Sequence, residues 1–229
     1  MKKMKTFDFN EFPLEYSRGI IDFLNCKIDL RNRVFIPRIE TEFWVKKAVG
    51  EIKRQETKNR GRKVLDIFAG SGCIGISVLK NVKNSLVDFV DIDERAIEQI
   101  KINLELNKIP EDRYKIYRSD LFKRLKGKTY DYIFANPPYV AKERLKEVQP
   151  SVLKYEPKRA ILAGKRGLIY IKRFLKEAKK FLNPSGTIYL EIDPQQKGDI
   201  KKILKKEKYN TFKFFEDQFK KCRFLKVRK

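Results

Sequence analysis

Strand-like and helix-like segments alternate along most of this 229-residue sequence, and this alternation restricts the fold more than any other feature. Short runs rich in Val, Ile, Leu and Phe take turns with segments whose apolar residues recur at helical spacing. Nearly continuous apolar strands are typical of parallel sheets that helices cover on both faces, because the chain must cross over between parallel neighbours. The pattern predicts an α/β fold with a doubly wound, mostly parallel sheet.

The expected elements follow this repeated order. Strands are expected at 64–68, 86–91, 114–118, 130–135 and 187–192, and helices at 75–81, 94–107 and 168–182. Two final strand-like runs, 209–215 and 222–227, are separated by a short polar turn. We therefore expect a C-terminal antiparallel hairpin that completes a seven-stranded sheet.

The polar stretch 53–63 (KRQETKNRGRK) is the best candidate for an internal boundary, and it divides an N-terminal segment, 1–55, from a main domain, 56–229. The basic start, 1–5, leads into a mixed run instead of an apolar core, so no export signal is indicated. No stretch approaches the roughly 18 apolar residues of a membrane span. We expect a cytoplasmic location and no membrane partner.

The N-terminal segment is less regular than the main domain. Its runs 23–28 and 34–36, separated by polar residues, predict a small β-hairpin. Helical spacing of apolar residues predicts a helix over 40–53. We expect this segment to cover one side of the sheet.

Histidine is absent from the sequence, which excludes the most common general base and the most common transition-metal ligand. The three cysteines, Cys26, Cys73 and Cys222, are far apart and lack C-x-x-C spacing. Neither a disulfide framework nor a metal site is indicated. Any chemistry must proceed without imidazole.

The net charge is +24, from 54 Lys and Arg against 30 Asp and Glu. Such a charge favours contact with RNA, with a ribonucleoprotein such as the ribosome, or with another acidic partner. A generally lysine-rich composition explains the same number equally well. The charge therefore supports an acidic partner without identifying it.

A small-residue turn follows the first expected strand. Segment 64–75 (VLDIFAGSGCIG) is typical of a buried strand, a turn and the start of a helix, and Gly70 and Gly72 permit close approach of a ligand to the backbone. Asp66 lies at the end of this strand and Asp91 at the end of the next, as expected for an acid that reaches ribose hydroxyls. The pattern predicts a nucleotide-type ligand.

The acid before the turn favours a particular ligand. The segment has no G-K-S/T, and Asp66 would repel a pyrophosphate but attract a cation. S-adenosyl-L-methionine carries an ammonium and a sulfonium, so we favour this methyl donor over a dinucleotide. The structural alternative is that Asp66 caps the turn and Asp91 caps the helix that starts near Asp93.

A second motif, Asn136-Pro137-Pro138-Tyr139, follows the hydrophobic strand 130–135. The two prolines hold the loop extended and rigid. The Asn136 side-chain oxygen and the Pro137 carbonyl can together accept both hydrogens of an NH2 group, and Tyr139 offers a flat face to a planar acceptor. Methyl transfer is a direct displacement that depends on placement, so no histidine is required. A chance N-P-P-Y turn is the alternative.

Ser119-Asp120-Leu121-Phe122 follows a third expected strand. Asp120 could accept a hydrogen bond from an adenine amino group while Leu121 or Phe122 packs on the ring. The competing interpretation is a turn acid followed by core residues.

From about Pro13 to the C-terminus, the sequence resembles the release-factor glutamine methyltransferases, within the class I methyltransferases. The most specific likenesses are 35–42 (FIPRIETE), close to the family's I-P-R-P-E-T-E, and N-P-P-Y at 136–139. Supporting pieces are Tyr155-Glu156-Pro157, Gly164, Gly167-Leu168, Leu190-Glu191-Ile192 before Gln195, and Arg223.

The resemblance implies a Rossmann-like fold that binds S-adenosyl-L-methionine and methylates the glutamine of the G-G-Q loop in a peptide-chain release factor. Asn136, Pro137 and Tyr139 would be catalytic, and Asn136 to Tyr139 would bind the glutamine. With the acids inferred above, the expected donor site comprises Asp66, Phe68, Ala69, Gly70, Ser71, Gly72, Asp91, Asp120, Leu121 and Asn136.

The sequence departs from the family at Phe68, Leu121 and Ile39, which replace a glycine, a tryptophan and a proline. The family carries a helical domain before this point, and we expect segment 1–55 to lack a full one. N-P-P-Y also occurs in methyltransferases that act on adenine or guanine amino groups in RNA or DNA, and this is the alternative function. A catalytically silent RNA-binding or scaffold protein is a third hypothesis.

Overall fold

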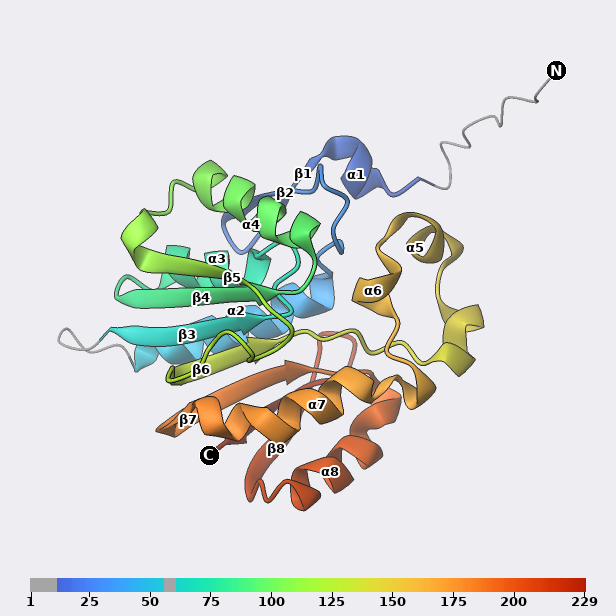
Figure 1. The fold of residues 1–229 in the computed structure, drawn as a ribbon. Helices are drawn as coiled ribbons and strands as arrows, with labels where there is room; N and C mark the ends of the chain where they lie inside the picture. Colours follow the sequence, from blue (N-terminus) through green and yellow to red (C-terminus); the bar gives the residue numbers. More distant parts are fainter. Residues whose placement is uncertain (1–11, 56–60) are drawn as a thin grey trace.

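The computed structural model describes residues 12–55 and 61–229, and it contains the predicted doubly wound sheet (Figure 1). Seven strands pair in the order β5-β4-β3-β6-β7-β9-β8. The first five in that order are parallel, and β9 pairs antiparallel with β7 and β8. The α/β fold class and the C-terminal hairpin are confirmed.

The strands are β1 (Ile20–Phe23), β2 (Cys26–Asp29), β3 (Arg62–Ile67), β4 (Ser85–Asp91), β5 (Tyr114–Arg118), β6 (Tyr130–Ala135), β7 (Leu182–Glu191), β8 (Thr211–Glu216) and β9 (Cys222–Arg228). The α-helices are α1 (Leu14–Arg18), α2 (Ile39–Arg54), α3 (Cys73–Asn81), α4 (Glu94–Leu106), α5 (Pro150–Tyr155), α6 (Lys158–Ile161), α7 (Ile169–Ala178) and α8 (Lys197–Lys206). Short 3-10 turns are η1 (Glu111–Arg113), η2 (Lys142–Glu147), η3 (Lys165–Gly167), η4 (Lys179–Phe181) and η5 (Pro194–Gln196).

Helices cover both faces of the sheet, which is why its central strands are apolar on both sides. All six residues of β6 are buried. Successive residues of β3 enter different cores: Val64 packs with α2, α3 and α4, whereas Leu65 packs with α7 and α8. The period-2 alternation of a strand thus supplies both hydrophobic layers.

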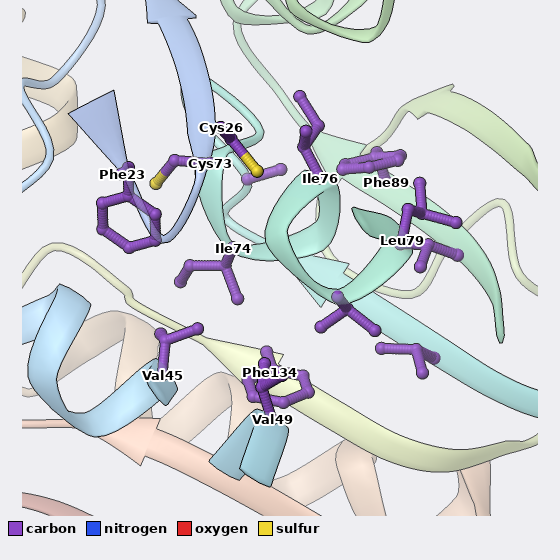
Figure 2. Close-up of a cluster of buried hydrophobic side chains, with 14 of the residues drawn as sticks. Phe23, Cys26, Val45, Val49, Cys73, Ile74, Ile76, Leu79, Phe89 and Phe134 are labelled. Carbon is purple, nitrogen blue, oxygen red and sulfur yellow. The ribbon is translucent and has the colours of Figure 1, made fainter. Parts of the chain in front are cut away.

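Figure 2 shows how the first of these layers joins the N-terminal segment to the sheet. Phe23 and Cys26 of the small hairpin lie near Ile74 of α3, and Val45 and Val49 of α2 lie on the other side of that residue. All of these side chains are buried. The N-terminal segment is therefore packed into the main core.

The strand order reverses between β3 and β6. The chain runs outward through β4 and β5, then returns to place β6 on the other side of β3, with Ile67 opposite Ala135 at the carboxyl ends. Crevices form at such reversals, because the following loops diverge to opposite faces. The turn after β3 and the N-P-P-Y loop after β6 therefore lie side by side.

The predicted pairing of 23–28 with 34–36 is wrong. The hairpin joins β1 to β2, and its turn is Leu24-Asn25, with both φ angles positive at 44° and 64°. Two positive φ values give the tight turn whose twist suits a two-residue hairpin, so this turn divides the predicted first strand. Residues 34–36 have no regular secondary structure and lie in the segment that precedes α2.

Amide side chains of α4 and of its C-cap residue, Asn107, hold β2 in place. Asn103 Oδ1 accepts a hydrogen bond from Asp29 N at 2.7 Å, and Asn107 Nδ2 donates one to Lys27 O at 2.7 Å. These amides act as a neighbouring strand would and satisfy backbone groups of β2.

The helix predicted over 40–53 is present as α2, but α8 was not predicted. The predicted boundary at 55/56 and the basic start at 1–5 lie at or outside the limits of the described residues. Over the described ranges, no helix is long and apolar enough to cross a membrane, and no cluster of acids and cysteines could hold a metal ion.

Candidate active site

A cavity of about 770 Å³ opens at the carboxyl ends of the parallel strands. Its walls are the turn after β3, the end of β4, the loop after β5, the N-P-P-Y loop after β6, and segments around α2 and α5. Figure 1 shows α5 and α6 standing beyond that edge of the sheet. The fold therefore brings all three sequence motifs to one cavity.

The glycine turn presents its backbone to the cavity. Phe68, Ala69, Gly70 and Ser71 line the wall, and a side chain added at Gly70 would enter open space. Gly72 lies behind this wall, where a Cβ would approach Ile100 at 3.1 Å. The expected donor contact of Gly72 does not fit this position, and its role is to pack the turn against α4 at φ 77°.

Phe68 adopts a backbone conformation that favours glycine, with φ at 63°. A left-handed conformation costs about 1–2 kcal/mol at a non-glycine residue. The Phe68 ring contacts Tyr170 and Phe174 of α7 edge-on, with both centroid distances 6.2 Å. Packing against α7 therefore offsets strain at a position where the resembling family has glycine.

Asp66 is fully buried beneath the turn and does not line the cavity, so the expected direct contact with the donor does not fit its position. Its Oδ2 accepts a hydrogen bond from Gly75 N at 2.8 Å, while Oδ1 has no partner among the described residues. Burial, with the nearby Asp91 carboxylate, raises the Asp66 pKa to about 8. The contact with Gly75 is the turn-capping role that the sequence left open.

Asp91 lines the cavity at the end of β4. Its two oxygens accept hydrogen bonds from Gly70 N and Asp93 N, each at 2.9 Å. Burial raises the pKa of this carboxyl. Asp93, not Asp91, caps α4 by accepting from Arg95 N. Each Asp91 oxygen retains a lone pair that can accept from a ligand hydroxyl.

Asp120 and Leu121 also line the cavity, but the Asp120 carboxylate already has cationic partners. Arg173 donates to both of its oxygens at 2.8 Å, and Lys123 lies 2.9 Å away. Hydrogen bonds from Arg173 and Lys123 lower the Asp120 pKa. Phe122 packs instead in the core, stacked on Phe181 with a centroid distance of 4.4 Å.

Asn136, Pro137, Pro138 and Tyr139 line the cavity, and the backbone of the loop that they form is held from outside it. Gln196 Nε2 donates to Tyr139 O at 3.0 Å. The family-like residue highlighted in the sequence was Gln195, but Gln195 is exposed and Gln196 makes this contact. The loop is therefore fixed before any ligand binds.

A buried polar group lies behind this loop. Glu191, at the end of β7, accepts hydrogen bonds on Oε2 from Thr41 Oγ1 and Trp44 Nε1, both at 2.7 Å. Tyr139 OH lies 3.5 Å from Glu191 Oε1, and Asn136 Nδ2 lies 3.4 Å from Thr41 Oγ1. Burial raises the Glu191 pKa. Thr41 and Glu191 both lie in family-like segments of the sequence, but a contact between them was not predicted.

Two further family-like segments meet at the cavity wall. Arg38 forms an ion pair with Glu156 Oε1, and Ile36 N donates to Glu156 Oε2 at 3.1 Å. The Arg38 guanidinium also lies 4.8 Å from the centre of the Phe35 ring. The segment 35–42 is thereby tied to the segment 155–157 at the cavity wall.

Comparison with known proteins agrees with this geometry. The Methyltransferase small domain family matches residues 52–155. The release factor glutamine methyltransferase of Thermodesulfovibrio yellowstonii is 34% identical over 90% of this chain and 72% of the relative, and that of Clostridium botulinum is 32% identical over 96% and 77%. The chain belongs to the release factor glutamine methyltransferase family.

Solved structures agree in fold. The hMettl16 catalytic domain, in complex with MAT2A 3'UTR hairpin 6, aligns with a TM-score of 0.67 at 17% identity, over 90% of this chain and 75% of that one. The ribosomal protein L11 methylase of Lactobacillus delbrueckii aligns at 0.56 and 17% identity, over 85% and 79%. These likenesses show the class I methyltransferase fold alone.

The donor side of the cavity fits S-adenosyl-L-methionine. Open space over Gly70 leaves room for a ligand against the backbone, and Asp91 offers acceptors at the end of the neighbouring strand. The unpartnered oxygen of Asp66 lies beneath the same turn. Asp91, unlike Asp120, forms no ion pair with another described residue, and a carboxylate suits a cationic ligand.

Proposed function

We propose that this protein transfers the methyl group of S-adenosyl-L-methionine to the side-chain nitrogen of the glutamine in the G-G-Q loop of a peptide-chain release factor. One observation carries the proposal: a single cavity joins the turn 68–71 and Asp91 to the rigid loop 136–139. The relatives' names supply the class of acceptor.

On the donor side, the chain's residues bind and orient. Asp91 would accept hydrogen bonds from the ribose hydroxyls, the backbone of 68–71 would line the methionine portion, and Leu121 would flank the adenine. The bound cofactor supplies an electrophilic methyl group on a sulfonium. Because Arg173 and Lys123 engage the Asp120 carboxylate, we assign Asp120 a part in shaping the wall.

On the acceptor side, Asn136 Oδ1 and Pro137 O would accept the two amide hydrogens of the glutamine, and Tyr139 would pack against the amide plane. This fixes the nitrogen and the face of the amide that meets the methyl group. As the nitrogen–carbon bond forms, the bond from that carbon to the donor sulfur would break, and the nitrogen would lose one of its two protons to solvent. Good placement of two reacting groups contributes about 7–11 kcal/mol in well-oriented systems. Catalysis by placement agrees with a sequence that contains no histidine.

The charge of the cavity favours a protein acceptor over a nucleic acid. The charged residues in the described lining are Glu40, Asp91, Asp93, Asp120, Glu147, Glu191, Arg38, Arg159, Arg173 and Arg223. Acids outnumber bases there although the whole chain carries +24. Single-stranded nucleic acids bind in positively charged grooves, so this acidic lining does not suit an RNA or DNA strand.

The test is transfer to an isolated release factor with isotope-labelled S-adenosyl-L-methionine, followed by mass spectrometry of the peptide that contains G-G-Q. We expect label on the glutamine and none on a Gln→Glu factor, because a carboxylate offers no hydrogens to Asn136 and Pro137. Labelling of bare RNA or DNA, with none on the factor, would contradict the proposal.

We also propose that the excess positive charge brings the enzyme close to RNA, as on the ribosome, through the outer surface of α7, η4 and α8. These elements carry ten Lys and Arg against two acids, whereas α2, α3 and α4 on the other face carry seven against six. The helices on the two faces of the sheet therefore differ in charge, which a uniformly lysine-rich composition does not explain. Lys201, Lys202 and Lys205 are exposed and form no salt bridge with another described residue.

The basic surface is tested by RNA binding at several salt concentrations. Lys201, Lys202 and Lys205→Gln should flatten the slope of log affinity against log salt by about two to three, because fewer counterions are released. The matched control is Lys46, Lys47 and Lys53→Gln on α2, with the same charge change. Equal slopes for both variants would show that RNA binding depends on the total charge of the protein and not on the surface of α7, η4 and α8.

A further inference from the structure

Three side chains from distant parts of the sequence form one hydrogen-bonded chain behind the acceptor loop. Asn136 Nδ2 lies 3.4 Å from Thr41 Oγ1, and Thr41 Oγ1 lies 2.7 Å from Glu191 Oε2. Thr41 and Glu191 are each 1% exposed. The contacts join the loop after β6, the first turn of α2 and the end of β7.

The chemistry of the three groups fixes the direction of these hydrogen bonds. The Trp44 indole N–H can only donate, and it donates to Glu191 Oε2 at 2.7 Å, so this oxygen is an acceptor. With Glu191 as the carboxylate, the Thr41 hydroxyl gives its one hydrogen to the same oxygen. What remains on Thr41 is a lone pair, and only a donor can satisfy it. The Nδ2 end of Asn136, not the Oδ1 end, must face Thr41.

We infer that Thr41 and Glu191 are positioning residues that set which end of the Asn136 side-chain amide faces the acceptor. With Nδ2 held toward Thr41, Oδ1 points into the cavity and accepts a hydrogen from the substrate NH2. The inference rests on the proposed function for the identity of that substrate. A flipped amide would present a donor, which repels an NH2 group and suits a carboxylate.

The same carboxylate lies against the other end of the loop. Tyr139 OH is 3.5 Å from Glu191 Oε1. The other oxygen, Oε2, accepts from Thr41 and Trp44. The buried Glu191 carboxylate therefore supports Tyr139 directly and Asn136 through Thr41. The role of the segment 37–42 is therefore to place Thr41 between the strand end and the loop.

The first experiment compares Thr41→Val, which keeps the shape but removes the hydroxyl, with Thr41→Ser, which keeps the hydroxyl. The matched control is Thr187→Val, a buried threonine on β7 outside the cavity lining. We expect T41V to lower kcat for the release factor roughly a hundredfold, because a misplaced acceptor aligns poorly with the donor. T41S and T187V should stay within a few-fold of wild type, with donor affinity unchanged in all three.

A second readout separates orientation from general damage. Binding of a Gln→Glu release factor should strengthen relative to the natural factor in T41V, because the freed Asn136 amide can turn its donors toward a carboxylate. A merely disturbed site would weaken both factors together. An unchanged ratio of the two affinities, or a kcat for T41V equal to that of T187V, would overturn the inference.

Glu191→Gln tests the same contacts without removing an acceptor. This variant replaces T41V as the test if T41V does not bind the donor. The glutamine oxygen can replace Oε2, and its NH2 can face the Tyr139 oxygen. We expect transfer within a few-fold of wild type. A hundredfold loss would show that the negative charge matters and not the orientation. If wild-type enzyme transfers nothing to the release factor, the proposed function fails, and the affinity ratio still tests the orientation.

Discussion

The two halves of the cavity rest on buried carboxylates whose surroundings differ. Glu191, behind the acceptor loop, has hydrogen-bonding partners on both oxygens. Asp66, beneath the donor turn, has Gly75 N on one oxygen and no described partner on the other. Because unsatisfied buried polar groups are costly, the acceptor half has its polar groups paired without a ligand, whereas the donor half keeps one buried oxygen without a described partner.

This difference assigns distinct tasks to the two halves. The acceptor site is already ordered, so no binding energy is needed to order it when the substrate binds. Its contacts should therefore affect the rate of methyl transfer. On the donor side, burial raises the pKa of both Asp66 and Asp91, and of these two acids only Asp91 lines the cavity. Substitutions in one half should therefore change kcat and those in the other should change donor affinity.

The largest effect is expected from Asn136→Ala. Loss of the side-chain acceptor should lower kcat by roughly 100- to 1000-fold, as when one preorganised polar group is removed from other active sites. The dissociation constant for S-adenosyl-L-methionine should change by less than about threefold. Single-turnover kinetics measure the first quantity and calorimetric titration the second. Near-wild-type turnover would show that Asn136 does not position the acceptor nitrogen.

Asp91→Ala should produce the opposite pattern. The ribose hydroxyls lose a charged acceptor, which corresponds to about 1.5–3 kcal/mol of donor affinity. Asp112→Ala is the control, because Asp112 is exposed in η1 and lies outside the cavity lining, so donor affinity should stay unchanged. Calorimetry with S-adenosyl-L-methionine separates the two. An unchanged affinity in the Asp91 variant would remove this residue from the donor site.

The two halves also differ in how far they could be predicted from the sequence. The turn 68–72 and Asp91 are set by short-range patterns, since glycine, strand ends and a helix start lie within a few residues of each other. Their cavity contacts were therefore largely predictable, although Asp66 and Gly72 proved to lie behind the wall. Spacing alone does not show whether a residue faces the ligand or the core.

The support of the acceptor half could not be derived from spacing. Thr41 and Glu191 are 150 residues apart, and Arg38 and Glu156 are 118 apart. Such contacts depend on the strand order, which places β7 beside β6 and α2 across them. The resemblance singled out the right segments, but only the fold shows which of them touch.

A smaller effect is expected in the pH dependence of stability. Burial raises the folded-state pKa of Asp66 to about 8, above the ordinary value of 3.8. The contribution of Asp66 to the free energy of unfolding is therefore fully present below about pH 4 and is lost as pH rises toward 8. This group alone changes the free energy of unfolding by at most about 1.4 kcal/mol per pH unit. Urea denaturation between these limits should show a decline that Asp66→Asn reduces.

Asp112→Asn, at an exposed aspartate in η1, is the control for that decline. It should leave the pH dependence unchanged. If Asp66→Asn behaves in the same way, then Asp66 is ionised in the folded protein, and the contrast between the two buried carboxylates disappears.

The smallest effect concerns salt, and it distinguishes the two ligands of the cavity. Donor binding depends on buried carboxylates at short range, which salt screens weakly, whereas encounter with a release factor depends on the exposed charge of a +24 protein. Raising ionic strength from about 0.01 M to about 0.15 M shortens the Debye length from about 30 Å to about 8 Å. We expect kcat/KM for the release factor to fall several-fold, while kcat and the donor dissociation constant change by less than about twofold. Steady-state kinetics over this range provide the test. A parallel fall in kcat would mean that surface charge affects the methyl-transfer step itself. The contacts of the acceptor half would then not be sufficient to set the rate of transfer.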